Sequence, residues 1–258
     1  MVHRGWSADY QGLPPADVYL MCEADAALEP LMNAVTPRTG SMPAAGLPTT
    51  AEMTDLVSIR ALAHALNEAT AGTDVCITRL PLGWNGEYRH FRHPLDYIGL
   101  EGGGGVGAGC GLVIGAALGL KGTGRIPVAI MGDGDFLMGA TALWTAVHYQ
   151  IPGLIIVANN RSFYNDEVHQ ERVAKERARP IENKWIGQRI NEPDIDLAMM
   201  ARSQGAEGIG PITRVEDIRP AIDRGLQAVR EGKTCVIDMR VVPGYDTNMS
   251  GSQASQKR

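Results

Sequence analysis

The chain has 258 residues, a composition that is 44% hydrophobic, and a formal net charge of −5 at pH 7. A hydrophobic share of this size is ample for a buried core, and the length suits one large α/β domain, alone or with an appendage. The negative charge and the interspersed charged residues argue against nucleic acid as the main partner.

The cysteines and the N-terminus bear on location. The four cysteines, which show no CxxC or metal-ligand spacing, are Cys22, Cys76, Cys110 and Cys235. We expect them to be buried thiols of a reducing cytoplasm. The opening sequence MVHRGWSADYQG lacks the apolar core of a signal peptide, and no run approaches the ~20 apolar residues of a membrane helix. The prediction is a cytoplasmic protein without a membrane partner.

Residues 1–50 do not suffice for a complete domain. Ala16–Cys22 favours a short buried strand and Ala26–Val35 a helix, and the segment TGSMPAAGLPTT has the composition of a linker. We therefore predict a strand–helix extension with a linker over 1–50, a main domain over 51–244, and a polar, disordered tail over 245–258.

The main domain opens with a predicted helix, a strand and a long loop. Thr54 is the expected cap of the helix, and Asp74–Thr78 is the expected strand. The loop Leu80–Leu100 carries two histidines, two arginines and four aromatic residues near the expected ligand edge, a mixture typical of binding loops. His90 and His93 each have two interpretations, a catalytic role or a surface, locally hydrogen-bonded one.

Four consecutive glycines lie near the start of Glu101–Leu120. They predict a tight loop that enters a helix packed closely on its neighbours. A dinucleotide-binding GxGxxG loop is the competing interpretation. We disfavour it because no clear strand precedes the glycines and no acidic residue follows a second strand at the expected distance.

The most informative stretch is a predicted strand–helix–strand unit. The apolar runs Ile126–Met131 and Leu154–Ala158 flank a segment with apolar residues at helical spacing. A right-handed crossover makes the two strands parallel, so their carboxyl ends lie on one sheet edge. The GDG sequence at 132–134 should therefore face the NN sequence at 159–160.

The chemistry of this edge suggests its occupant. Asp133, Asn160 and nearby carbonyl groups offer hard oxygen ligands that suit Mg²⁺ or Ca²⁺. The flanking glycines, and a helix expected to start around Met138, favour an anion in the same space. We predict a metal with a phosphate group, against the alternative that both sequences are ordinary strand-terminating turns.

The two motifs resemble the thiamine diphosphate (ThDP) motif of acetolactate synthase-like enzymes and benzoylformate decarboxylase. In that motif GDG is followed after about two dozen residues by NN, and the segment ALWTAVHYQIP between them is also similar. The resemblance covers about residues 50–244, with weaker support for 16–40. It implies the ThDP-binding α/β fold, a doubly wound and mostly parallel sheet flanked by helices, and it implies ThDP and Mg²⁺ as cofactors. The implied metal ligands are Asp133, Asn160 and the carbonyl of Ser162.

The resemblance also implies further cofactor contacts. The Gly104 carbonyl would accept a hydrogen bond from the 4′-amino group of ThDP. Val106 would separate the two cofactor rings, although the family usually has Leu, Ile or Met there. The remaining implied cofactor-binding residues are Gly132, Gly134, Asp135, Phe136 and Tyr164.

Residues just past the metal-binding loop resemble those that line the substrate side. On that pattern Tyr164, Asn165 and Asp166 would contact substrate, and Asp166 would take part in proton transfer. Asp166 has a second interpretation as the cap of a charged helix predicted from about Asp166 to Arg177. The segment up to Ile190 suits a lid or an interface.

The last predicted elements are a helix over Asp196–Ser203, a longer helix over Val215–Arg230, and a buried strand over Thr234–Val242. Their order is similar to the end of the family's ThDP-binding domain.

The resemblance implies a partner as well. In this family a glutamate in a separate pyrimidine-binding domain activates ThDP, and this chain has no room for that domain. We expect a second subunit that carries it, in an α₂β₂ assembly. The expected reaction is decarboxylation, C–C cleavage or carboligation of a 2-oxo acid or acyloin. The alternatives are a non-catalytic scaffold or regulatory subunit of the same fold, or an NAD(P)-binding oxidoreductase.

Overall fold

The computed structural model describes residues 2–3, 17–18, 20–37, 39–40, 57–99 and 106–244. The chain divides into two compact units, Met1–Ala45 and Gly46–Arg258. Most of the predicted linker, the predicted cap Thr54 and the predicted tail lie outside the described residues.

In the N-terminal unit, the described residues form one helix and a short parallel strand pair. The strands are β1 (Val2–His3) and β2 (Leu20–Met21), and the helix is α1 (Ala24–Ala34). The predicted strand and helix of this region are thus confirmed, but the strand is much shorter than predicted and is not buried, since Met21 is 53% exposed. The helix exposes four apolar side chains at helical spacing, Leu28, Leu31, Met32 and Val35.

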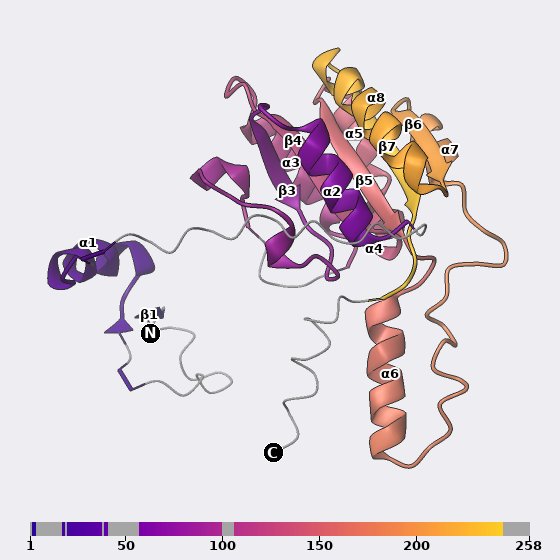
Figure 1. Ribbon diagram of the computed structural model, residues 1–258, viewed down its shortest axis with the longest axis horizontal. Helices are drawn as coiled ribbons and strands as arrows, with labels where there is room; N and C mark the ends of the chain where they lie inside the picture. Colours follow the sequence, from indigo (N-terminus) through magenta and orange to yellow (C-terminus); the bar gives the residue numbers. More distant parts are fainter. Residues whose placement is uncertain are drawn as a thin grey trace. The chain divides into compact units, whose positions relative to one another are not determined.

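The main domain is built on a parallel sheet of five strands in the order β3-β4-β5-β7-β6 (Figure 1). The strands are β3 (Val75–Arg79), β4 (Ile126–Gly132), β5 (Gly153–Asn159), β6 (Glu207–Ile212) and β7 (Thr234–Arg240). Every residue of β3 and β5 is buried, as expected for parallel strands covered on both faces. The predicted doubly wound, parallel α/β fold is confirmed.

Successive strand residues point to opposite faces of the sheet, and a helical layer covers each face. Ile130, Ile156 and Ile237 pack in one core with α2 (Ile59–Ala69) and α8 (Ile218–Arg230). Met131 and Val157 pack in a second core with the helices of the other face. These helices are α3 (Gly109–Gly119), α4 (Asp133–Gly139), α5 (Ala142–His148) and α7 (Leu197–Arg202).

Several predicted boundaries need correction. Ser58, whose hydroxyl accepts a hydrogen bond from the Ala61 amide at 3.1 Å, caps α2, so the predicted cap Thr54 is wrong. The helix between the two central strands is two short helices, and the first begins at Asp133 rather than around Met138. The last predicted helix begins with a 3₁₀ turn over Val215–Asp217.

The edge strand β6 is absent from the sequence predictions. Its sequence, EGIGPI, contains two glycines and a proline, which weaken any strand pattern. Proline is tolerated here because an edge strand leaves some of its amides without a ladder partner. The register of β6 with β7 shifts between Ile209 and Ile212, next to that proline.

Cys76, Cys110 and Cys235 are buried free thiols, as predicted, whereas Cys22 is half-buried. Burial raises the pKa of the Cys110 and Cys235 thiols to about 12. Among the helices of the described residues, none is long and apolar enough to cross a membrane.

A close contact between β6 and α7 makes a testable prediction. A Cβ added at Gly208 would lie 2.1 Å from the carbonyl oxygen of Ala198. Because backbone must then move, Gly208→Ala should lower the free energy of unfolding by about 1–3 kcal/mol in urea titrations. As the matched control, Gly111→Ala adds a Cβ with nothing within 4 Å and should stabilise α3 by about 0.5–1 kcal/mol. Equal effects of the two changes would refute this account of the packing.

Candidate functional site

The carboxyl ends of β4 and β5 bring the two predicted motifs together. Gly132 pairs with Ala158 in the parallel ladder, so the next residues leave the sheet side by side. The amide of Ser162 donates a hydrogen bond to Oδ2 of Asp133 at 3.1 Å. The prediction that the GDG and NN sequences face one another is confirmed.

Asp133 is the central group of this edge. Its side chain is almost fully buried, at 3% exposure, and it also accepts a hydrogen bond from the Gly134 amide at 3.0 Å. Burial raises the pKa of this carboxyl to about 6, although the surrounding backbone amides lower it. A buried carboxylate that backbone amides only partly stabilise is well suited to hold a cation.

Asn160 and Ser162 lie in a tight loop beside Asp133. The Asn160 side-chain oxygen accepts a second hydrogen bond from the Ser162 amide, at 3.0 Å. Arg161 between them adopts a left-handed conformation, with φ of 60°. The described residues form no cluster of three or more His, Cys, Asp or Glu side chains suited to a metal. A metal here would therefore use Asp133 with amide and carbonyl oxygens, which is the donor set that Mg²⁺ prefers.

A distant segment supports this loop. The Phe163 amide donates to the Gln188 carbonyl at 2.9 Å, and the Ile190 amide donates to the Arg161 carbonyl at 2.8 Å. Ser162 and Arg189 form the antiparallel bridge between the two segments. The loop after β5 is thus paired on both of its edges, with Asp133 on one side and residues 188–190 on the other.

A buried acidic side chain on β7 supports the loop after β5 through Asn159. Asp238 is fully buried, and its Oδ1 accepts a hydrogen bond from Asn159 Nδ2 at 2.8 Å. Asn159 in turn accepts from the Arg161 amide at 3.1 Å. Sequence analysis missed Asp238, although one acidic residue in the apolar run TCVIDMRVV was a usable signal.

A niche at this edge of the sheet brings the same loop together with the segment before α7. The Arg240 guanidinium contacts Asp194 at 3.2 Å and the Ile195 carbonyl at 3.2 Å. The residues that line the niche are Asp133, Leu137, Asn159, Arg161, Ile190, Ile195, Leu197 and Arg240.

The helix after the Asn160–Ser162 loop, which we call the metal loop after its predicted role, is α6 (Tyr164–Glu176). It begins two residues earlier than predicted. Its N-cap is Phe163, so the interpretation of Asp166 as the cap is wrong. Asp166 is exposed in the first turn, where a carboxylate favours the helix dipole. Its proton-transfer role, and the substrate contacts of Tyr164 and Asn165, stay predictions.

Glu167 is the second functional candidate that the sequence did not reveal. It is buried to 4% exposure, and it accepts a hydrogen bond from the Ser162 hydroxyl. Arg189 lies 3.5 Å from the same carboxylate. The Ser162 hydroxyl is therefore bound to the protein, which leaves its carbonyl as the implied metal ligand.

The residues after Asp133 have structural roles. Both oxygens of Asp135 bind Arg79 and backbone amides, and Phe136 is fully buried in the core. A Cβ at Gly134 would lie 2.2 Å from the ring of Phe163, so only glycine fits there. Cofactor contacts predicted for Asp135 and Phe136 would therefore involve their backbone.

The glycine-rich segment is described only in part. Gly104 lies outside the described residues, and its predicted contact stays a prediction. Val106 is 52% exposed, which is compatible with a side chain that contacts a ligand or another protein.

The predicted position of His90 and His93 near the cofactor edge is not supported. The loop that carries them reaches the amino edge of the sheet at Asp96, which contacts Arg125. The His93 ring caps a 3₁₀ turn by accepting from the Leu95 amide, and Asp96 in that turn binds Arg125, just before β4, at 2.6 Å. Next to His90, Arg89 binds Asn67 at the end of α2. The locally hydrogen-bonded interpretation therefore holds for His93, and a catalytic role beside Asp133 of the same chain is not supported for either histidine.

The raised pKa of Asp133 can be measured directly. In metal-free protein we expect its carboxyl to titrate at about 6 because burial disfavours the charge. The folded chain then binds this proton more tightly than the unfolded chain, whose pKa is near 3.8. Asp133 should thus add stability as pH falls from about 6 towards 4, and reduce stability above pH 6.

Carbon-13 NMR of the carboxyl, assigned with Asp133→Asn, is the measurement for this prediction. A saturating divalent cation should move the midpoint below about pH 4, since the metal favours the ionised form. A midpoint near 4 without metal would contradict the prediction.

Comparison with known proteins places this geometry in a family. The family model described as "Thiamine pyrophosphate enzyme, C-terminal TPP binding domain" matches residues 81–239. Sulfoacetaldehyde acetyltransferase of Alcaligenes xylosoxydans xylosoxydans is 30% identical over 133 residues, which are 50% of this chain and 20% of that protein. Benzoylformate decarboxylase of Pseudomonas aeruginosa is 27% identical over 147 residues, 54% of this chain and 24% of that protein.

Solved structures share the fold. The thiamine diphosphate-dependent 4-hydroxybenzoylformate decarboxylase of Rhodococcus jostii RHA1 superposes with a TM-score of 0.69 at 24% identity, over 90% of this chain and 41% of that chain. The chain spans only 20% to 24% of the two curated relatives. Because the family model covers most of the main domain, the chain belongs to the thiamine pyrophosphate enzymes, and it carries their C-terminal TPP-binding domain.

Proposed function

We propose that this chain is the ThDP- and Mg²⁺-binding subunit of a decarboxylase, C–C lyase or carboligase that acts on a 2-oxo acid or an acyloin-type substrate. The observation that carries the proposal is the buried carboxylate of Asp133, with its pKa raised to about 6, beside the Asn160–Ser162 loop. The names of the relatives support a carbonyl substrate, since benzoylformate is a 2-oxo acid and sulfoacetaldehyde is an aldehyde.

The residues of this chain would bind and orient the cofactor. Asp133, the Asn160 side chain and the Ser162 carbonyl would ligate Mg²⁺, which in turn would hold the diphosphate. Gly134 lacks a side chain, which makes room for the Phe163 ring beside Asp133. Bound ThDP supplies an electron sink for a bond broken or formed at a carbonyl carbon.

We also propose that a second subunit completes the active site with a pyrimidine-binding domain and the activating glutamate, in an α₂β₂ assembly. The support is the outer surface of the α3–α5 layer. The sequence of α3, GCGLVIGAALG, contains no charged residue, and a helix that is apolar all round is normally buried.

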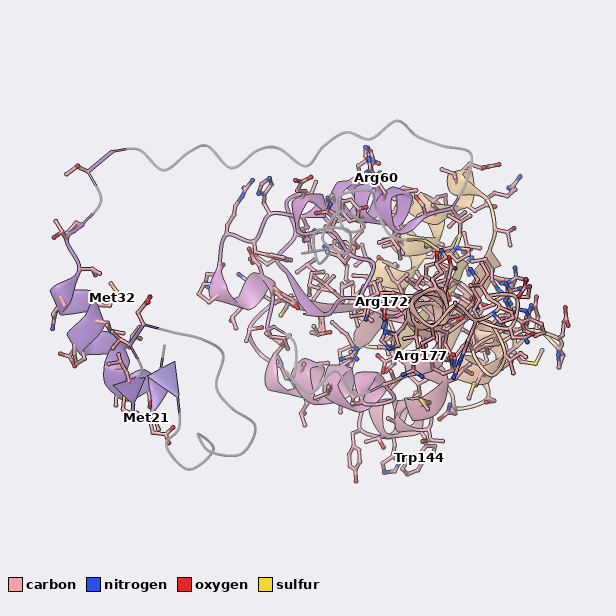
Figure 2. All side chains as sticks on the ribbon, turned by 90° about the horizontal axis from the view of Figure 1, so that it is seen from below. Met21, Met32, Arg60, Trp144, Arg172 and Arg177 are labelled. Carbon is pink, nitrogen blue, oxygen red and sulfur yellow. The ribbon has the colours of Figure 1, made fainter. Side chains whose placement is uncertain are left out.

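Large apolar side chains are nevertheless exposed on this layer, and Figure 2 shows Trp144 projecting from it. The others are Leu112, Leu118, Met138 and Tyr149. Exposed apolar surface of this kind is typical of protein interfaces.

Calorimetric titration with ThDP tests the function. We expect binding that requires Mg²⁺ and that tightens when the partner subunit is added. Asp133→Ala should weaken binding by about 100-fold or more, since it removes the charged metal ligand. Asp223→Ala, which changes an exposed carboxylate on α8, is the matched control and should bind like the wild type.

A screen of 2-oxo acids with the assembled subunits then tests the reaction. Binding without any turnover would favour a non-catalytic scaffold subunit. If the chain binds no ThDP, alone or with the partner, the proposed function is refuted.

The support that Asp238 gives to the metal loop leads to a further prediction. Asp238→Leu removes the acceptor of Asn159, so the loop that carries Asn160 should lose its fixed position. We expect about a 10–100-fold loss of Mg²⁺ affinity in the presence of ThDP, the usual range for a group that orients a metal ligand. Asp238→Asn keeps an oxygen acceptor, so its Mg²⁺ affinity should fall less than that of Asp238→Leu. Unchanged Mg²⁺ affinity in the folded Leu variant would exclude this role.

A further inference from the structure

One carboxylate joins three elements next to the candidate cofactor site. Asp135 lies in the first turn of α4, and its Oδ2 is 2.6 Å from Arg79 Nε at the end of β3. Its Oδ1 accepts hydrogen bonds from the Gly107 amide at 2.7 Å and the Gly109 amide at 3.2 Å, where the chain enters α3. We call this group of four residues, Arg79, Gly107, Gly109 and Asp135, the Asp135 latch.

The glycines of the latch fit closely around the ion pair. A Cβ at Gly109 would lie 2.3 Å from Asp135 Oδ2 and 3.0 Å from Arg79 Nε. Gly107 has φ of +96°, and a Cβ there would lie 2.8 Å from Met138 Cβ. The backbone of 107–109 therefore follows a path that side chains would block, and the carboxylate fixes this path through two amides.

The ion pair itself is shielded from water. The side chains of Arg79 and Asp135 are each 11% exposed. In such a setting, loss of one partner leaves the other charge uncompensated, so the two residues should behave as a unit. The pair Arg214–Asp217 has a similar Nε–Oδ2 distance of 2.8 Å but is exposed on both sides.

The position of the latch distinguishes it from the metal loop. Asp135 is two residues from Asp133, yet Asp133 accepts hydrogen bonds from the Gly134 and Ser162 amides, which do not belong to the latch. Loss of the latch should therefore free 107–109 while the contact between Asp133 and Ser162 persists.

We propose that Arg79 and Asp135 are positioning residues that hold the glycine-rich segment at a fixed place relative to the diphosphate end of the cofactor site. The inference rests on the proposed function, because it takes the edge at Asp133 as the diphosphate end. The remainder of ThDP then contacts the segment that the latch fixes. Pyrophosphate, which has only the diphosphate end, would not contact the segment that the Asp135 side chain fixes.

The test compares two ligands in calorimetry, Mg²⁺ with ThDP and Mg²⁺ with pyrophosphate, with the partner subunit present if the wild type needs it. Asp135→Asn should weaken ThDP binding about tenfold or more and change pyrophosphate binding less than about threefold. Arg79→Lys keeps the charge, so its ThDP affinity should fall less than that of Arg79→Met. The double variant Arg79→Met with Asp135→Asn should lose less than the sum of the single changes, as expected for a coupled pair.

The control is the exposed pair, where Arg214→Met and Asp217→Asn should leave both affinities unchanged. Hydrogen exchange at the amides of 107 and 109 gives a readout independent of ligand, and their protection should fall in Asp135→Asn. If Asp135→Asn does not fold, Arg79→Lys carries the same comparison.

Equal losses for ThDP and pyrophosphate, or no loss for either, would overturn the positioning role while leaving the proposed function intact. If the wild type binds neither ligand, the proposed function itself fails.

Discussion

The structure of the site depends on burying one charge at the place where two parallel strands end. The ladder between β4 and β5 fixes Asp133 opposite the loop after Asn159, and the core around Phe136 excludes water from one side. The rise of the Asp133 pKa from 3.8 to about 6 corresponds to about 3 kcal/mol of unfavourable free energy in the folded, metal-free chain. A bound cation would offset this energy, so the fold keeps a strained electrostatic position that binding relieves.

Two carboxylates that are not predicted metal ligands, Asp238 and Asp135, lie near Asp133. Asp238 supports the loop that carries Asn160, and Asp135 fixes the entry to α3. Each acts through backbone or amide groups, and each lies at the carboxyl end of the sheet. The sheet therefore fixes where the loops at its carboxyl end lie, and short side chains are enough to hold the conformations of these loops.

The central part of the fold could be predicted from the sequence because its signals are local. The apolar runs of β4 and β5 are continuous, and the polar sequences that follow them mark where these strands end, whereas the apolar run of β7 is interrupted only by Asp238. The edge strand β6 could not be predicted, since glycine and proline hide its pattern and only pairing with β7 defines it. The break between α4 and α5 was likewise hidden, because apolar spacing continues across it.

The site was predictable to the extent that it follows the chain order. Asp133 and Asn160 close two adjacent strands, so topology alone brings them together. Asp238 and Glu167 come to the same place from a distant strand and from the next helix, and sequence spacing does not encode such contacts. The histidines show the opposite error: the loop after β3 starts at the site edge but crosses the sheet, as the contacts of Asp96 with Arg125 reveal.

The pairing of the metal loop with residues 188–190 has an evolutionary consequence. The segment from Tyr164 to Trp185, which includes α6, leaves the domain and returns to it where residues 161–163 pair with residues 188–190. Figure 1 shows α6 running away from the sheet. Insertions, deletions or sequence drift in this segment beyond Glu167, whose carboxylate binds the Ser162 hydroxyl, would leave the pairing with residues 188–190 unchanged. Selection can thus remodel this segment while the loop that carries Asn160 and Ser162 is inherited intact.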